Sequence, residues 1–368
     1  MRPAELPMPD PQALATSRAL LERIGAELEA GHNWISFARY MELVLHEPGL
    51  GYYAGGAQKF GAAGDFVTAP ELGGLFGRTL ARQIKDLRFS TILEVGAGSG
   101  ALAETLLSRL SCEYQILETS PDLRSRQRER LKDKASWLDR LPERFRGVII
   151  ANEAVDAMPA HAVAWTAEGI MERGVAIDGG NLVWRQRQAQ GELLERARAI
   201  GAEPHYESEI GLIGQAWMRR IGECLEEGVA LIVDYGFARH EYYHPQRSMG
   251  TLMCHHRHGA HGEVFFQPGR QDVTAHVDFS ALAGAAREAG LEVLGYATQA
   301  QFLVNCGITD VLGEANVENA LHYAPLASEA QKLLSPAEMG ELFKVLAVGR
   351  GVKQPLSGFA RGNRSHTL

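Results

Sequence analysis

The sequence of 368 residues contains few cysteines and no long apolar segment. The four cysteines are Cys112, Cys224, Cys254 and Cys306. No two of them form a CxxC pair, which excludes a disulfide framework and favours a reducing compartment. No apolar run approaches the ~20 residues that a membrane-spanning helix needs. Basic residues are not in excess either. The sequence has 37 Lys and Arg against 45 Asp and Glu, a formal net charge of −8, which argues against a nucleic-acid-binding protein.

The N-terminal segment MRPAELPMPDPQALA also lacks the features of a targeting sequence. It has neither the basic region nor the apolar region of a signal peptide, and Glu5 and Asp10 are unlike the acid-poor composition of a transit peptide. We therefore expect a soluble, cytoplasmic protein without a membrane span.

Short apolar runs alternate with helical segments through the centre and the C-terminal part of the sequence. The predicted strands are Thr91–Val95, Tyr114–Leu117, Gly147–Ala151, Val229–Val233, Leu291–Tyr296 and Val345–Val348. The first four are apolar throughout and end in polar residues, which is typical of strands covered on both faces in a parallel sheet. Their alternation with helices predicts an α/β fold with a doubly wound sheet.

The chain is expected to divide into three parts. Residues 1–88 predict an N-terminal helical cap and a glycine-rich loop that covers a cofactor. Residues 89–350 predict the doubly wound domain, with insertions of strands and loops at about 159–227 and 240–278. Residues 351–368 are polar and basic, and we expect them to form a flexible tail.

The strongest motif is a glycine-rich turn directly after the first predicted strand. The turn contains Gly96, Ala97, Gly98 and Gly100. Its glycines allow a tight turn and the close approach of a cofactor, and the helix that follows offers N–H donors. Glu94, two residues earlier, could hold the ammonium group of S-adenosylmethionine (SAM) through a bound water. Glu118 ends the next strand, where a carboxylate can accept hydrogen bonds from both ribose hydroxyls.

Two alternatives to a SAM site remain open for this turn. The spacing also satisfies the dinucleotide fingerprint, so NAD is possible, although a pyrophosphate usually prefers a site without acidic side chains. A glycine-rich turn without any ligand is the second alternative.

Asn152, Glu153 and Asp156 follow the predicted central strand, and the carboxyl ends of such strands border the ligand crevice. We expect Asn152 to bind the cofactor, and Glu153 and Asp156 to be catalytic. A guanidinium group stays charged up to a pKa above ~12, so a base cannot deprotonate it in advance. Two carboxylates could bind it, orient one nitrogen and accept the proton as the new C–N bond forms. Alternatively, these acids merely cap the following helix.

A polar, glycine-rich loop precedes the first strand. Gly64, Asp65, Thr68 and Glu71 belong to this loop, and we expect it to close over the cofactor. Thr68 could equally be an ordinary N-cap of a helix at Glu71–Ile84, with a proline in its first turn.

A cluster of one cysteine and four histidines lies at residues 254–261. Its members are Cys254, His255, His256, His258 and His261. They are enough ligands for zinc, but no second ligand pair follows at a standard spacing, and adjacent histidines on a strand point to opposite faces. We therefore predict no metal site, and expect hydrogen bonding or ring packing. Further on, His276 precedes a helix at Phe279–Ala289 and could line an acceptor pocket, and we expect it to be a third catalytic residue.

Several ordered motifs, between Ile35 and Gly349, resemble the MidA-like family of SAM-dependent methyltransferases. The motifs occupy residues 35–41, 51–53, 64–71, 94–100, 152–157, 234–236 and 272–279. The mitochondrial members of this family are the protein arginine methyltransferases of complex I assembly. The sequence departs from them in two respects: it shows no transit peptide, and Gly262-Glu263-Val264 stands where a shorter acidic turn is expected.

The resemblance implies a class I SAM-methyltransferase fold, Rossmann-like, with SAM at Gly96–Gly100, Glu118 and the Asp65 loop and S-adenosylhomocysteine (SAH) as the product. It also implies an arginine of a respiratory complex I subunit as the acceptor. A small-molecule acceptor remains an alternative, as does a non-catalytic SAM-binding assembly factor. Neither the arginine nor its degree of methylation follows from the sequence, and the oligomeric state, a homodimer included, stays open.

Overall fold

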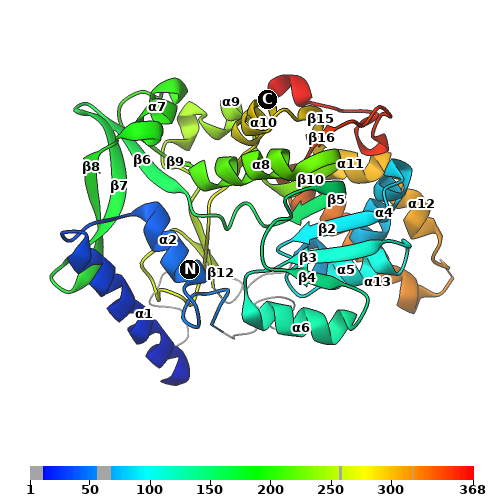
Figure 1. The fold of residues 1–368 in the computed structure, drawn as a ribbon, viewed down its shortest axis with the longest axis horizontal. Coiled ribbons are helices and arrows are strands. Elements are labelled where there is room, and N and C mark those ends of the chain that lie inside the picture. Colours follow the sequence, from blue (N-terminus) through cyan, green and yellow to red (C-terminus); the bar gives the residue numbers. More distant parts are fainter. Residues whose placement is uncertain (1–10, 56–67, 257–258, 317) are drawn as a thin grey trace. The chain divides into compact units, whose positions relative to one another are not determined.

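In a computed structural model, the chain forms two compact units (Figure 1). The structure describes residues 11–55, 68–256, 259–316 and 318–368. Unit 1 comprises residues 1–66, 156–215 and 239–278, and unit 2 comprises residues 67–155, 216–238 and 279–368.

The core of unit 2 is a twisted sheet with the strand order β15-β16-β10-β5-β2-β3-β4. Its strands are β2 (Thr91–Val95), β3 (Glu113–Leu117), β4 (Ser136–Leu138), β5 (Phe145–Asn152), β10 (Leu225–Phe237), β15 (Glu292–Thr298) and β16 (Phe343–Arg350). Strands β4, β3, β2, β5 and β10 are parallel, whereas β16 runs antiparallel to both of its neighbours. This arrangement confirms the doubly wound α/β fold and all six predicted strands. The short strand β4 was not predicted.

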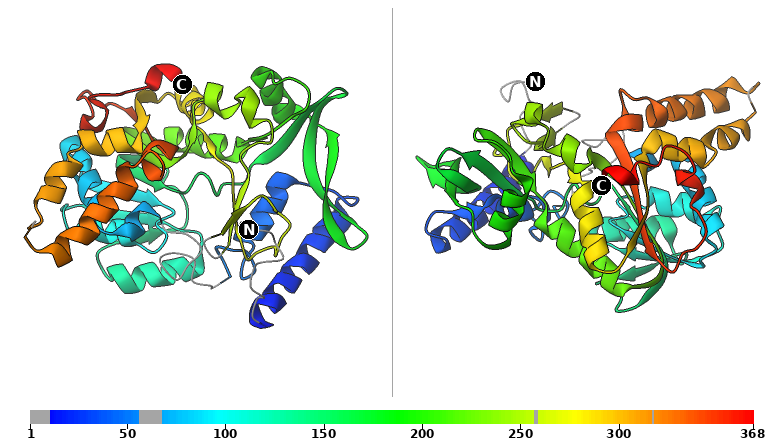
Figure 2. Two further views of the ribbon diagram at one scale, coloured as in Figure 1. Left: turned by 180° about the vertical axis from the view of Figure 1, so that it is seen from behind. Right: turned by 90° about the horizontal axis from the view of Figure 1, so that it is seen from above.

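Helices of unit 2 surround this sheet (Figure 2). They are α3 (Ala69–Leu72), α4 (Leu75–Leu87), α5 (Ala101–Leu107), α6 (Pro121–Leu131), α10 (Phe279–Glu288), α11 (Gln299–Asn305), α12 (Ile308–Gly313), α13 (Ala320–Leu334) and α14 (Met339–Leu342), and α8 (Leu212–Cys224) enters from unit 1. Leu80 of α4, Leu106 of α5 and Phe302 of α11 join Val148 and Ile150 of the sheet in one buried core. None of the described helices is long and apolar enough to span a membrane.

The helix predicted at Glu71–Ile84 is interrupted in the structure. Gly73 and Gly74 separate α3 from α4. The first N–H groups of α4 are satisfied by a distant residue, since Glu329 Oε1 of α13 accepts hydrogen bonds from Leu75 N at 2.8 Å and Phe76 N at 3.3 Å. A carboxylate at a helix N-terminus also interacts favourably with the positive end of the helix dipole. The break therefore rests on a tertiary contact.

The C-terminal segment packs onto unit 2 instead of forming the flexible tail that its polar composition predicts. The ring centroid of Phe359 lies 5.2 Å from that of Phe302. Gly358 N donates to Gln83 Oε1 at 2.7 Å, and Arg364 N donates to Tyr296 O at 2.6 Å. One buried aromatic ring and a few main-chain hydrogen bonds are enough to anchor a polar segment.

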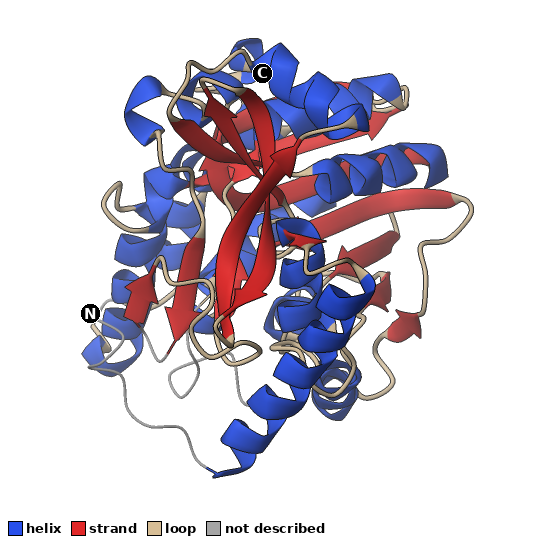
Figure 3. Cartoon of the chain, turned by 90° about the vertical axis from the view of Figure 1, so that its left-hand side faces the viewer, coloured by secondary structure: helices blue, strands red, loops and turns tan. Residues whose placement is uncertain are grey.

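Unit 1 combines the N-terminal helices with both predicted insertions. Its larger sheet has the order β1-β7-β6-β9, and β8 pairs with β7. These strands are β1 (Ile35–Ser36), β6 (His161–Thr166), β7 (Gly169–Asp178), β8 (Asn181–Gln188) and β9 (Tyr206–Ile210); β7 and β8 form the long twisted hairpin that faces the viewer in Figure 3. Strand β1 pairs with β7, Ile35 opposite Val175. The N-terminal segment is therefore part of this unit rather than a separate cap.

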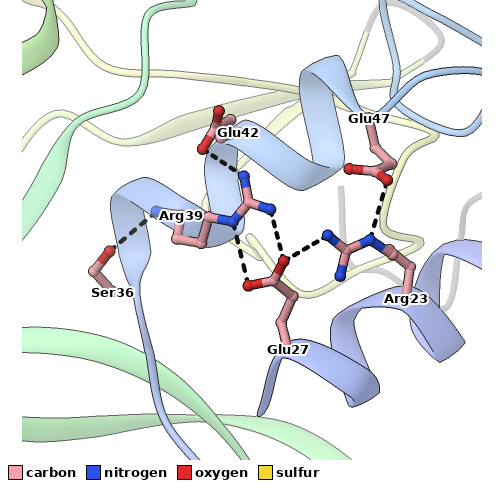
Figure 4. A network of polar contacts seen from close by, with 6 residues as sticks. All are labelled: Arg23, Glu27, Ser36, Arg39, Glu42 and Glu47. Carbon is pink, nitrogen blue, oxygen red and sulfur yellow. Dashed lines mark hydrogen bonds and ion pairs between the residues drawn. The ribbon is translucent and has the colours of Figure 1, made fainter. Parts of the chain in front are cut away.

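A second, smaller sheet of unit 1 has the order β12-β11-β13. The remaining elements of the unit are α1 (Pro11–Ala30), α2 (Phe37–His46), α7 (Gly191–Ile200), α9 (Arg239–Tyr242), β11 (Met253–His256), β12 (Gly259–His261), β13 (Asp272–Thr274) and β14 (Val277–Asp278). An ion-pair network joins α1 to α2 (Figure 4). In it, Glu27 accepts from Arg23 and Arg39, which also pair with Glu47 and Glu42 respectively.

Candidate functional site

The glycine-rich turn and the Asn152-Glu153 pair lie at the topological switch point of the unit 2 sheet. Strand β2 pairs with β3 on one side and with β5 on the other. The chain proceeds from β2 to β3 and β4, then returns to β5, so the direction of winding reverses between β2 and β5. Val95 is opposite Ala151, and therefore Gly96 and Asn152 leave neighbouring strand ends. Open α/β sheets bind ligands at this position.

The backbone of the turn requires glycine. Gly96, Gly98 and Gly100 have φ values of +69°, +53° and +81°. A Cβ atom on Gly96 would also lie 3.2 Å from Ala154 Cβ. Ala97 is buried within the turn, and Gly100 N donates to Ala97 O at 2.8 Å. The turn is thus closed by its own hydrogen bond, and its glycines keep side chains away from the strand ends.

Two buried carboxylates flank the turn. Glu94 accepts a hydrogen bond from Tyr114 Oη at 2.7 Å, and burial raises the pKa of Glu94 to about 7. Glu118 accepts from Ser120 N at 2.9 Å and from Gln127 Nε2 at 3.0 Å, and burial also raises the pKa of Glu118. Burial disfavours the charged form of both carboxylates. A cationic or hydroxyl-bearing ligand that binds them at this edge would stabilise that charged form.

Glu153 has a strained backbone at the end of β5. Its φ is +50°, and Glu153 N donates to Val233 O at 2.8 Å. The side-chain Oε1 accepts hydrogen bonds from Ala69 N and Asn152 Nδ2, both at 3.2 Å. A non-glycine residue in the left-handed region costs roughly 1 kcal/mol or more, and such strain is concentrated at functional sites. Within the described part of the chain, no hydrogen bond reaches the buried Asn152 Oδ1.

The loop residues expected around the cofactor are described in part. Gly64 and Asp65 lie outside the described residues. Thr68 is buried but its side chain does not cap α3. Glu71 lies beside the glycine turn, where it accepts a hydrogen bond from Ser99 Oγ.

Asp156 and His276 both belong to unit 1, where their segments meet. Ala275 N donates to Asp156 O at 3.2 Å, and His276 N donates to Thr251 Oγ1 at 3.1 Å. Asp156 is buried. The main-chain hydrogen bond between Ala275 and Asp156 thus brings the segments of the two predicted residues together. Glu153, in contrast, belongs to unit 2.

Comparisons with known proteins agree with this geometry. Residues 75–297 match the model of a family described as S-adenosyl-L-methionine-dependent methyltransferases. The protein arginine methyltransferase NDUFAF7, mitochondrial, of Danio rerio is 30% identical, over 85% of this chain and 83% of its own length. The chain belongs to the MidA-like family of SAM-dependent methyltransferases.

Two further relatives of this methyltransferase are informative. The NDUFAF7 homologue of Drosophila melanogaster, named as a mitochondrial protein arginine methyltransferase, is 28% identical over 89% of this chain and 85% of its own. A crystal structure of a methyltransferase-like protein from Burkholderia thailandensis, bound to SAH, is 49% identical with a TM-score of 0.95, covering 99% of this chain and 100% of that one. The fold is that of class I SAM methyltransferases, and the cofactor is SAM.

The expectation of a cytoplasmic protein is wrong by this comparison. The Danio rerio, Drosophila melanogaster and Homo sapiens relatives are all named mitochondrial proteins. An N-terminal composition without transit-peptide features was too indirect a signal for that inference.

Two histidines of the cluster, His256 and His261, make local contacts, and His258 lies outside the described residues. His256 Nδ1 hydrogen-bonds with Arg270 O at 2.8 Å, and His261 Nδ1 accepts from Glu263 N at 3.2 Å. Both imidazole rings meet the ring of Phe266 edge to face. Among the described residues, no group of three or more His, Cys, Asp or Glu side chains could hold a metal ion.

Sequence reasoning missed the residues of α6 that contact the site. They are Arg124, Gln127 and Arg130. The signal was a helix that is polar at almost every position, shortly after a strand that a carboxylate follows. It was not recognised because an apolar stripe is the usual sign of a buried helix face.

Proposed function

We propose that this methyltransferase transfers the methyl group of SAM to a side-chain nitrogen of an arginine in a protein, with a respiratory complex I subunit as the acceptor. The relatives' name, protein arginine methyltransferase, supports the type of acceptor. The observation that carries the proposal is the Glu153 carboxylate. It is held by two hydrogen-bond donors, on a strained backbone, at the strand end next to the glycine turn.

Among the described residues, those proposed to hold the cofactor lie in unit 2. Glu118 would accept hydrogen bonds from the two ribose hydroxyls, and Glu94 would hold the ammonium group through water. The glycines of the Gly96–Gly100 turn would let the cofactor approach the backbone closely. Asn152 contributes its buried Oδ1 as an acceptor. Gly64, Asp65, Thr68 and Glu71 are the proposed covering loop. When bound, SAM supplies an electrophilic methyl group.

Glu153 acts on the acceptor. Its carboxylate binds the guanidinium group, orients one nitrogen and accepts the proton that this nitrogen loses as the C–N bond forms and the C–S bond of the donor breaks. Ala69 N and Asn152 Nδ2 donate to Oε1 and hold the carboxylate in place for this role. Asp156 and His276 are proposed as further acceptor residues.

The variant Glu153→Gln tests the role of the carboxylate. Its amide is isosteric but cannot accept the proton, so we expect SAH affinity within about twofold of wild type and turnover lower by roughly 10²–10⁴-fold. Isothermal titration calorimetry and methylation with labelled SAM measure the two quantities. The control is Glu143→Gln, an exposed acid on the same unit. Normal turnover of Glu153→Gln would exclude the proposed role.

The acceptor is tested separately. Labelled SAM is added to a lysate with the purified enzyme, and an arginine acceptor predicts label in a protein band. Label confined to small molecules would favour the small-molecule alternative, and SAH binding without any transfer would favour a non-catalytic assembly factor. Mass spectrometry of respiratory complex I subunits, from cells with and without the gene, would then identify the arginine and its degree of methylation.

A further inference from the structure

A stripe of polar side chains on α6 connects the glycine turn with the ends of β3 and β4. Arg124, Gln127 and Arg130 are spaced by three residues and share one side of the helix. Arg124 Nη2 donates to Glu118 O at 3.1 Å and to Leu138 O at 2.6 Å. Arg130 Nη1 donates to Ser99 Oγ at 2.7 Å. The middle residue, Gln127, is fully buried.

The amide of Gln127 makes three hydrogen bonds. Its Nε2 donates to Gly98 O at 2.9 Å and to Glu118 Oε2 at 3.0 Å, and its Oε1 accepts from Trp137 Nε1 at 3.0 Å. A reversed amide would turn its oxygen toward two acceptors and its NH₂ group toward the indole donor. The indole of Trp137 therefore selects the same orientation of the amide as the two acceptors do.

Glu118 is fixed from two directions by this arrangement. Ser120 N donates to Oε1 at 2.9 Å, and Gln127 donates to Oε2. The same Gln127 Nε2 group holds the Gly98 carbonyl, so one side chain sets both the plane of the carboxylate and its distance from the glycine turn. A buried carboxylate without such donors would be free to rotate or to take up a proton.

We propose that Gln127 is a positioning residue that directs the Glu118 carboxylate at the ribose hydroxyls of the cofactor, with Trp137 fixing the Gln127 amide. The proposal rests on the role given to Glu118 above. It makes Gln127 a determinant of selectivity for the ribose diol, although Gln127 does not itself touch the cofactor.

The test compares two ligands, SAH and the SAH analogue that lacks the 2′- and 3′-hydroxyls, by calorimetry. We expect wild type to bind the analogue at least ~10-fold more weakly than SAH, since a hydrogen bond to a charged group is lost. Gln127→Met keeps the length of the side chain and removes its amide. We expect this variant to bind SAH about 10-fold more weakly than wild type, with affinity for the analogue within about twofold.

The control is Gln115→Met, on the neighbouring strand β3, where the glutamine hydrogen-bonds to Glu113 at 2.8 Å. It should leave both affinities unchanged. Equal weakening of both ligands by Gln127→Met would show a merely structural role, and no weakening of either would equally overturn the proposal. A wild-type protein that does not distinguish the two ligands would instead refute the role of Glu118.

A second variant keeps the proposal testable if Gln127→Met does not fold. Trp137→Phe removes the indole donor but keeps an aromatic ring for Arg128, whose guanidinium carbon lies 5.4 Å from the ring centroid of Trp137. We expect a smaller loss of SAH affinity, about 3-fold, with unchanged affinity for the analogue, so that the selectivity for the hydroxylated ligand falls. Unchanged selectivity in Trp137→Phe would contradict the part of the proposal that concerns Trp137.

Discussion

The buried acid Glu94, which we propose as a ligand of the cofactor's ammonium group, would couple its own protonation to cofactor binding. Its pKa is raised to about 7 by burial, so the carboxyl holds its proton to a higher pH than an ordinary glutamate does. A ligand ammonium favours the ionised form of Glu94. Below pH 7, ligand binding is therefore coupled to the release of a proton from Glu94. We expect SAH affinity to increase with pH, by up to tenfold per unit below 7, and to level off above it. Calorimetry between about pH 5.5 and about 8.5, a range that includes the pKa of Glu94, measures this change in affinity.

Two variants separate Glu94 from other titrating groups. Glu94→Gln should bind SAH weakly with little pH dependence. Tyr114→Phe removes the 2.7 Å hydrogen bond that lowers the pKa of Glu94, so the increase in affinity should move to higher pH. An unchanged pH profile in Glu94→Gln would assign the titration to another group.

At this scale, sequence reasoning was strongest where residue type alone limits the backbone. Gly96, Gly98 and Gly100 could be recognised because their positive φ angles require glycine. The left-handed backbone of Glu153 could not, since no sequence feature marks a strained acid. Gln127 could not either, because its significance lies in contacts with Gly98, Glu118 and Trp137, which are separate in sequence.

Among the elements, α1 and α2 are joined by a network whose centre is Glu27. Glu27 Oε1 accepts from Arg39 Nη2 at 2.7 Å and from Arg23 Nη2 at 2.5 Å (Figure 4). The hydrogen bond from Arg39 is the main cause that lowers the pKa of Glu27. We expect Glu27→Gln to reduce the free energy of unfolding by about 1 kcal/mol at pH 7, as for a partly exposed ion-pair network.

The pH dependence of that difference gives a stricter test. The folded-state pKa of Glu27 lies below its unfolded value, so its stabilisation is present above the unfolded pKa and is lost as pH falls through the folded one. The difference between wild type and Glu27→Gln, from urea denaturation, should therefore vanish in acid. Glu29→Gln, an exposed acid on the same helix, is the matched control and should cost nothing at either pH. A difference that persists in acid would point to packing instead of charge.

Elements were predictable where burial imposes a continuous apolar run. Strand β2 was predicted with its correct bounds, Thr91–Val95. Strand β7 was missed because two charged residues interrupt its apolar sequence: Glu172 and Arg173 lie opposite residues of both β6 and β8. The short strand β4 offers only three residues, too few for any periodicity.

For the whole molecule, the sequence could not reveal which segments form a unit together. Unit 1 is assembled from three separate stretches of chain. Its assembly depends on pairings such as Ile35 with Val175, which lie far apart in sequence and leave no local pattern. The resemblance of the chain to the MidA-like family made the fold and the cofactor predictable, since both follow from motifs whose residues are close together along the chain.

The proposed cofactor residues that the structure describes lie in unit 2, which predicts where ligand binding stabilises the protein. Glu94, Gly96, Glu118 and Asn152 all belong to unit 2. SAH at 100 times its dissociation constant should stabilise the folded protein by about 2.7 kcal/mol. Hydrogen exchange should therefore slow in residues 91–131, while exchange in the β7–β8 hairpin of unit 1 stays the same. Protection that is strongest in the hairpin would move the cofactor away from the glycine turn, and with it the positions assigned to both buried carboxylates.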